Sequence, residues 1–280
     1  MKFTKYLLLV FPLAALIAGC DKHDLGYADS DLVGDRAMFQ ISYVAPKANN
    51  AANAMDSIYV NNKLVAGVTG SGRLLTTGQP LPYGASNYTG HYFVANAGST
   101  NIKFYKNDNV VYDRDVVLSE GRQKVFVYSL DQDPIVIKDI YPNEVTSGIP
   151  ETDTFDSDSL CTIRFFNFFF ENPTTPYAGK LQYQWSNNSD RKCIKGDWHN
   201  VGEPVGFGEA TEHCAVVVHK TVYNSAGYQE MWFRCIDEDG NMLKPDYWTF
   251  YIGRRYNHIL RWCRTGTPAG AYQQCNDYAQ

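Results

Sequence analysis

Short runs with alternating apolar and polar positions recur along the chain after residue 35. In residues 36–44, Phe39, Ile41 and Tyr43 fall on one face, and a period of two predicts a half-buried β-strand. Further β-like runs follow at 57–60, 63–65, 101–105, 110–112, 116–118, 124–130, 134–138, 162–170, 181–185, 215–219, 231–236, 247–252 and 258–262. After the N-terminal segment the pattern shows no convincing period of 3.6, so it predicts an all-β protein.

Polar turns between neighbouring runs predict β-hairpins. Asn61 and Asn62 separate the runs at 57–60 and 63–65, and residues 106–109 form a similar polar interruption. Asn tolerates the positive φ angles that tight hairpin turns require. Adjacent runs in both places are therefore expected to pair as antiparallel strands.

The two halves of the chain resemble each other. The opening runs around Phe39 and Ile163 are 124 residues apart, and so are the aromatic–Gly pairs at Tyr83 and Phe207. Two Gly-Arg segments that precede the last strands are 132 residues apart. Three matches in the same order, with nearly constant spacing, indicate a duplicated all-β module.

Composition then divides the chain into modules. Residues 142–159 contain prolines, acids, Ser and Thr with few large apolar side chains, which predicts a linker. We therefore expect a first β-sandwich at 36–141, a second at 160–265 and a tail at 266–280. Many short strands with frequent turns favour two tandem immunoglobulin-like or transthyretin-like β-sandwich modules.

The N-terminus has the features of an export signal. Two lysines and no acid precede an apolar run at 6–18 that is too short to span a bilayer. Ile17-Ala18-Gly19-Cys20 resembles the lipobox of bacterial lipoproteins. This resemblance implies a signal peptide at 1–19 and a lipid-modified Cys20 that begins the mature chain, followed by a tether at 20–35. The alternative is an ordinary secretory signal with a chance cysteine.

The anchor implies a place for the protein. We expect the bacterial cell envelope, with the chain attached to the outer membrane through the lipid at Cys20 and exposed at the surface. The formal net charge is −5, and removal of Lys2 and Lys5 with the signal would leave −7. A basic block is absent from the sequence, which argues against a nucleic-acid partner. After the signal, no apolar stretch approaches ~20 residues, so no transmembrane helix is predicted.

Six cysteines follow Cys20, and all lie in the second half of the chain. An oxidising compartment makes disulfides plausible, but the sequence cannot choose the pairing. The alternative is that those in strand-like runs are buried thiols. Their spacing lacks the close Cys pairs of common zinc sites. The six are Cys161, Cys193, Cys214, Cys235, Cys263 and Cys275.

A search for catalytic and cofactor motifs finds none of the common ones. The sequence has no GxSxG, HExxH, P-loop or Rossmann glycine pattern. Glu209, Glu212, His213 and His219 are the best metal candidates, but they lack a compact ligand pair. We therefore expect no catalytic residues, no metal and no cofactor. The many acids leave open a carboxylate pair, as in a hydrolase.

Trp198 and His199 are the candidate binding residues. They lie in the polar loop 196–200, where an exposed Trp can stack on a sugar or anchor a protein partner. The alternative is that Trp198 folds over one end of the module.

Three segments together resemble an uncharacterised family of Bacteroidetes surface lipoproteins. They are Tyr43-Val44-Ala45-Pro46, the hairpin at 58–62 and the stretch 207–211. The resemblance implies tandem β-sandwiches, often described as cell-adhesion proteins, and brings no catalytic residues. We therefore expect a non-catalytic, lipid-anchored, adhesin-like protein that binds a protein or glycan surface. The alternatives are a glycan-binding accessory lipoprotein of a nutrient-capture system and a hydrolase with an unrecognised site.

Overall fold

The computed structural model describes most of the chain after residue 35. Residues 35–280 form one compact unit, separate from residues 1–34. The signal, Cys20, the tether and the linker lie outside the described residues. The described ranges are 36–48, 50–67, 80–81, 92–139, 160–186, 198–217 and 229–277.

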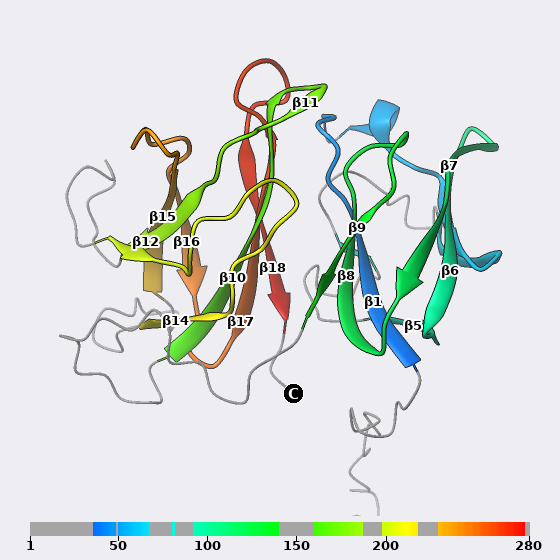
Figure 1. Cartoon of the computed structure of the whole chain (residues 1–280), viewed down its shortest axis with the longest axis horizontal. Coiled ribbons are helices and arrows are strands. Elements are labelled where there is room, and N and C mark those ends of the chain that lie inside the picture. Colours follow the sequence, from blue (N-terminus) through cyan, green and yellow to red (C-terminus); the bar gives the residue numbers. More distant parts are fainter. Residues whose placement is uncertain are drawn as a thin grey trace, which may run out of the picture. The chain divides into compact units, whose positions relative to one another are not determined.

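Two β-sandwiches make up the described part of the chain, as the alternating pattern predicts (Figure 1). A short 3-10 turn at Ala51–Asn53 interrupts the first. The strands of the first module are β1 Arg36–Tyr43, β2 Ser57–Val60, β3 Lys63–Gly67, β4 Pro80–Leu81, β5 Phe93–Asn96, β6 Gly98–Lys106, β7 Asn109–Leu118, β8 Gly121–Val127 and β9 Ile135–Lys138. Those of the second are β10 Leu160–Asn172, β11 Thr175–Pro176, β12 Gln182–Ser186, β13 His199–Asn200, β14 Cys214–Val217, β15 Gln229–Ile236, β16 Asp246–Phe250, β17 Arg255–Cys263 and β18 Ala271–Asp277.

The first module pairs its opening strand with its penultimate one. One sheet has the order β4-β1-β8-β9, with β5 also on β1, and the other has the order β3-β2-β6-β7. β1 and β8 run parallel, whereas the other pairs are antiparallel. The predicted hairpin turns are present, with positive φ at Asn61, Asn62, Asn107 and Asp108.

The second module repeats this arrangement, as the internal duplication predicts. Its sheets have the orders β11-β10-β17-β18, with β14 also on β10, and β13-β12-β15-β16. The opening strand β10 again runs parallel to the penultimate strand β17. The same topology in both halves therefore supports the alignment of Phe39 with Ile163.

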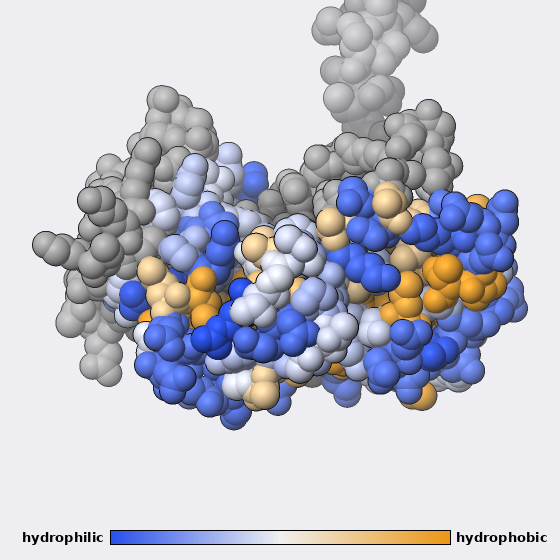
Figure 2. Space-filling model, turned by 90° about the horizontal axis from the view of Figure 1, so that it is seen from above, coloured by the Kyte–Doolittle hydropathy of each residue, from blue (hydrophilic) through white to orange (hydrophobic). Residues whose placement is uncertain are grey.

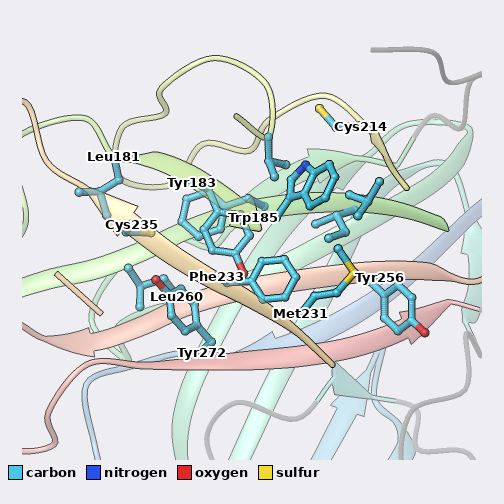
Figure 3. Packing of buried hydrophobic residues seen from close by; sticks show 14 of the residues in the cluster. Leu181, Tyr183, Trp185, Cys214, Met231, Phe233, Cys235, Tyr256, Leu260 and Tyr272 are labelled. Atoms are coloured by element: carbon cyan, nitrogen blue, oxygen red, sulfur yellow. The ribbon is translucent and has the colours of Figure 1, made fainter. Parts of the chain in front are cut away.

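Each sandwich buries its own apolar core between its two sheets. In the second core the Tyr183 ring stacks between Phe165 and Phe233, with ring centroids 4.4 and 5.6 Å away. Figure 3 shows Tyr183, Phe233 and Tyr272 pointing toward one another inside this cluster. A fully buried large side chain contributes roughly 1.5–3 kcal/mol, so these aromatic residues are a main source of stability.

The predicted tail at 266–280 is partly a strand. β18 pairs with β17 from Arg255 opposite Asp277 to Arg261 opposite Ala271. Tyr272 is buried in the second core, and its hydroxyl donates a hydrogen bond of 2.7 Å to the carbonyl of Lys244. One large side chain among polar neighbours is a weak strand signal, which explains why the periodicity missed β18.

Candidate functional site

The two modules meet through the outer faces of the sheets that contain β8 and β10. Phe126 of β8 and Phe168 of β10 are fully buried, with ring centroids 4.3 Å apart. Phe166, Ile259 and Val44 complete this cluster, which is separate from both sandwich cores. Because strand side chains alternate between faces, one face of β10 serves the second core and the other contacts the first module.

The segment Phe207-Gly208 closes this contact. The Phe207 ring packs against Phe170, at 5.0 Å, and against Tyr128 of the first module, at 5.4 Å. Gly208 has φ +77°, and a Cβ there would lie 2.5 Å from Cδ1 of Ile135. Only glycine meets both conditions, so this part of the 207–211 stretch supports the contact between modules.

An ionic cluster lies at one end of the same contact. Asp139 accepts a hydrogen bond of 2.8 Å from the Tyr92 hydroxyl and lies 3.2 Å from the Lys124 ammonium. Arg164 of the second module lies 3.4 Å from its other oxygen, and His213 Nε2 lies 3.7 Å away. The Lys124 and Asp139 side chains are only 5% and 4% exposed. These groups link the modules through charges that are almost fully removed from water.

The electrostatics of the cluster favour an ionised Asp139. Burial alone would raise the pKa of this carboxyl, but Lys124, the hydrogen bonds from His213 and Tyr92, and Arg164 together hold its pKa far below the ordinary value. Arg164 also donates a 2.8 Å hydrogen bond to the carbonyl of Lys138. Buried charges with several partners are costly to break apart, so this cluster fixes the position of β10 relative to β9.

A cleft of about 840 Å³ opens at the other end of the contact. Its walls come from the segments that follow β1 and β8, from the start of β7, and from the end of β10 with the turn into β11. Figure 2, a view from above Figure 1, shows apolar patches separated by hydrophilic residues and by residues of intermediate hydropathy. The described lining residues are Ala45, Pro46, Lys47, Val111, Tyr128, Ser129, Leu130, Asp131, Gln132, Phe170, Pro173, Thr174 and Pro176.

The cleft is suited to recognition by shape. Its volume lies within the range of roughly 300–1,000 Å³ for ligand pockets, which are mainly apolar with a few polar groups. Tyr128 offers aromatic surface and Pro46 a rigid wall, and the buried Phe170 lies behind them. Lys47 and Asp131 are the charged residues among the described lining. This set can hold an extended, partly apolar segment of a partner.

The predicted binding residues lie elsewhere. Trp198 is half-buried, and the guanidinium of Arg234 lies 4.1 Å from the centre of its ring. His199 is also half-buried and turns inward, with its ring 4.5 Å from that of the buried Trp185. Trp198 therefore packs against the sheet beside β13, away from the cleft, and binding by this pair stays a prediction.

Four of the six late cysteines are buried in the second module. Cys161, Cys235 and Cys263 are buried free thiols in this structure. Cys161 pairs with Val216, and Ile163 pairs with Cys214. Cys161 and Cys214 are thus diagonal neighbours, and a diagonal on a sheet is longer than the distance that a disulfide spans.

The remaining cysteines stay untested. Cys193 and the side chain of Cys275 lie outside the described part of the chain, so their pairing remains a prediction. Burial raises the pKa of the Cys235 thiol well above its ordinary value, and a protonated, buried thiol is unreactive. Cys235 therefore acts as a core residue.

The metal candidates do not gather into a described site. The Glu209 carboxylate accepts a 2.7 Å hydrogen bond from the backbone N–H of Gly206, and His213 faces Asp139. Among the residues that the structure describes, no group of three His, Cys, Asp or Glu could hold a metal ion. His219 lies outside them. The described residues also contain no helix that is long and apolar enough to span a membrane.

The sequence analysis missed the residues that line the cleft. Pro46 belongs to a segment that carries the family resemblance, and Tyr128 and Phe170 lie in runs that predict β-strands. The available signal was the set of prolines at strand ends, Pro46, Pro173 and Pro176. The positions of these prolines cannot show that the loop at Pro46 and the loop at Pro173, 127 residues later, face each other.

Comparison with solved structures gives nine matching chains, and two of them are described here. One is a "putative cell adhesion protein" from Bacteroides uniformis, with 9% identity and TM-score 0.25, covering 86% of this chain and 98% of that chain. The other is a "putative cell adhesion protein" from Bacteroides eggerthii, with 6% identity and TM-score 0.22, covering 88% of this chain and 98% of that chain. No family model and no curated protein sequence matches this chain.

Proposed function

We propose that this chain is a non-catalytic, lipid-anchored protein of the bacterial envelope that holds a surface partner in the cleft between its modules. The observation that carries the proposal is the cleft itself, about 840 Å³ in volume and built from both modules. Neither sandwich forms it alone, because Tyr128 belongs to the first module and Phe170 to the second. The partner is a protein segment with apolar side chains that fit between proline and aromatic walls.

The composition of the walls supports binding. Catalysis of hydrolysis requires a nucleophile beside a base, or a pair of carboxylates. The described lining offers a single carboxylate, Asp131, and the hydroxyls of Tyr128, Ser129 and Thr174. Aromatic, proline and aliphatic surface instead resembles the apolar centre of a protein-binding site.

The lipobox-like sequence at 17–20 supports the anchor. Several acyl chains together attach a protein firmly, whereas a single chain binds only marginally. In cells grown with labelled palmitate, the natural chain should carry the label, and Cys20→Ser should abolish it.

Surface exposure is tested separately. Protease treatment of intact cells should remove the chain. Protection until the outer membrane is broken would contradict surface exposure.

The role of the cleft is tested with Tyr128→Ala. We expect beads that carry the Tyr128→Ala chain to lose at least about tenfold in attachment to target cells, because truncation of a central aromatic residue that anchors a partner costs about 2 kcal/mol or more. The control is Tyr59→Ala, since the Tyr59 ring packs against Tyr105 and Tyr59 is not among the described residues that line the cleft. Equal attachment by Tyr128→Ala and the natural chain would refute the role of the cleft.

A further inference from the structure

The outer face of the β13-β12-β15-β16 sheet carries an aromatic row across its strands. Trp232 pairs with Ser186 on one side and with Tyr247 on the other. The β12–β13 register pairs Gln184 with Asn200, so Trp198, two residues earlier, falls opposite Ser186. The row therefore reads Trp198, Ser186, Trp232 and Tyr247.

The rings of this row are close and partly open to water. The Trp232 and Tyr247 centroids are 5.1 Å apart, and Tyr247 is 51% exposed. Trp198 and Trp232 are half-buried. Because strands lie about 4.8 Å apart, Trp198 and Trp232 are separated by about 10 Å over the small Ser186. Ser186 itself is buried, so the aromatic surface that this row offers to a ligand is the Trp232–Tyr247 pair.

A polar row runs beside the aromatic one. Arg234 Nε donates a 2.8 Å hydrogen bond to the side-chain oxygen Oε1 of Gln184. The side-chain Nε2 of Gln184 donates a 2.8 Å hydrogen bond to Oδ1 of Asn200. The Arg234 guanidinium also stacks on the Trp198 ring at 4.1 Å. These bonds fix planar donors and acceptors in one line, and each amide has further hydrogen-bonding capacity.

We propose that this face binds an oligosaccharide. A sugar ring has an apolar face of C–H groups and a rim of hydroxyls, so it needs flat aromatic surface with planar polar groups beside it. Trp232 and Tyr247 supply the surface, and Gln184, Asn200 and Arg234 supply the donors and acceptors. The face carries one described cation within a protein of negative net charge, which disfavours a polyanion such as nucleic acid.

The corresponding sheet of the first module lacks this combination. Its outer face also has two close rings, Tyr59 and Tyr105, 5.0 Å apart. Its amide, however, is held by carboxylates, because Asn101 donates to both Asp113 and Asp115 at 2.8 and 2.9 Å. The pair Tyr59 and Tyr105 therefore has aromatic rings without a row of amides beside them, and it serves as a control in the same chain.

The test is affinity electrophoresis of the mature chain in gels that contain one defined polysaccharide at a time. The probes are hydroxyethylcellulose, arabinoxylan, galactomannan and the glycans of gastric mucin. We expect at least one probe to retard the natural chain, and Trp232→Ala/Tyr247→Ala to weaken that binding at least about tenfold, the equivalent of about 1.4 kcal/mol. Trp232→Phe should restore most of it, because a phenyl ring still stacks.

The controls separate binding from folding and from the cleft. Tyr59→Ala/Tyr105→Ala should bind the probe like the natural chain, and so should Tyr128→Ala in the cleft. Tyr247→Ala alone, at an exposed position, should weaken binding with an unchanged melting temperature. Absence of retardation by all four probes, or equal loss from the Tyr59/Tyr105 variant, would overturn the proposal. Failure here leaves the attachment experiment with Tyr128→Ala unaffected.

Discussion

Gly208 meets two separate demands at one position. Its φ of +77° is unfavourable for other residues, and a Cβ would lie 2.5 Å from Ile135 across the contact between modules. Gly208→Ala should therefore lower the free energy of unfolding by about 1–3 kcal/mol, mainly from the strained backbone, with a smaller contribution from the displaced end of the Ile135 side chain. Urea unfolding measures the change.

Gly240 is the matched control for this prediction. Its φ is +81°, but a Cβ there meets no atom within 4 Å. Gly240→Ala should lose only the backbone contribution, about 1 kcal/mol. Equal losses at the two positions would show that the contact with Ile135 does not restrict residue 208.

His258 makes the second core sensitive to acid. The ring is fully buried, its Nδ1 lies 2.5 Å from the Tyr183 hydroxyl, and burial lowers its pKa to about 3. The unfolded chain takes up this proton near pH 6.5, so the stability from the neutral ring is complete above pH 6.5. It is lost as pH falls from 6.5 toward 3, at about 1.4 kcal/mol per pH unit.

The variant His258→Phe isolates this contribution. A plot of unfolding free energy against pH should be flatter for the variant between pH 6.5 and 4.5, by about 1 kcal/mol per unit. Parallel plots for the two proteins would contradict a neutral, buried His258. An NMR titration of the ring should also show no change at pH 5–7 in the folded protein.

The sequence predicted the strands better than it predicted the neighbours of single side chains. Trp198 was a candidate binding residue, which stays a prediction, and the structure places it against Arg234, thirty-six residues away. Cys161 and Cys235 were candidates for disulfides and are buried thiols. Both outcomes depend on which strands become neighbours, and a residue type in a local run does not specify that.

Among the elements, β8, β9 and β10 are joined by the charges around Asp139. Asp139→Asn would leave the Lys124 and Arg164 cations without their buried counter-charge. Removal of one partner from a buried ion pair costs about 3–5 kcal/mol, and we expect a loss of that order in urea unfolding. The contribution of Asp139 is present above the ordinary pKa of an aspartate and is lost as pH falls below it, because its folded pKa is lowered.

A surface ion pair provides the comparison. Arg114 and Asp133 lie 3.4 Å apart, and the Asp133 side chain is 86% exposed. Asp133→Asn should leave the stability unchanged within error, since exposed pairs contribute little. A small effect of Asp139→Asn, similar to that of Asp133→Asn, would mean that water compensates the buried cations.

Strands with clear alternation were predictable, and those without it were not. The run at 36–44 became β1, and the hairpin at 57–65 became β2 and β3. β4 and β13 have two residues each, too few for a period, and β18 carries mostly polar side chains. Such strands form because a neighbouring strand offers hydrogen bonds, which is a property of the folded sheet rather than of the segment.

For the whole molecule, the buried contact between modules predicts cooperative unfolding. Phe126 and Phe168 are both fully buried in it. Calorimetry of the natural chain should give one transition. Phe126→Ala/Phe168→Ala removes apolar contacts worth about 3–5 kcal/mol each and should give two transitions, one for each module.

A core variant tests whether this separation is specific. Phe233 lies inside the second core, so Phe233→Leu should lower the transition temperature and keep a single transition. Two transitions in the natural chain, or one in the Phe126/Phe168 variant, would contradict coupling through the contact. The duplication was readable from the sequence, but its outward-facing phenylalanines appeared there only as an unusually apolar strand.

The parallel pairing of β1 with β8 also decides where the chain enters the folded unit. β1 starts at Arg36, beside the start of β8, whereas the cleft is lined by residues around the far ends of β1, β8 and β10. Eight residues at about 3.3 Å each separate the two ends of β1 by about 25 Å. Under the proposed anchor at Cys20, the segment that carries the lipid would therefore join the folded unit at the end of β1 that lies away from the cleft.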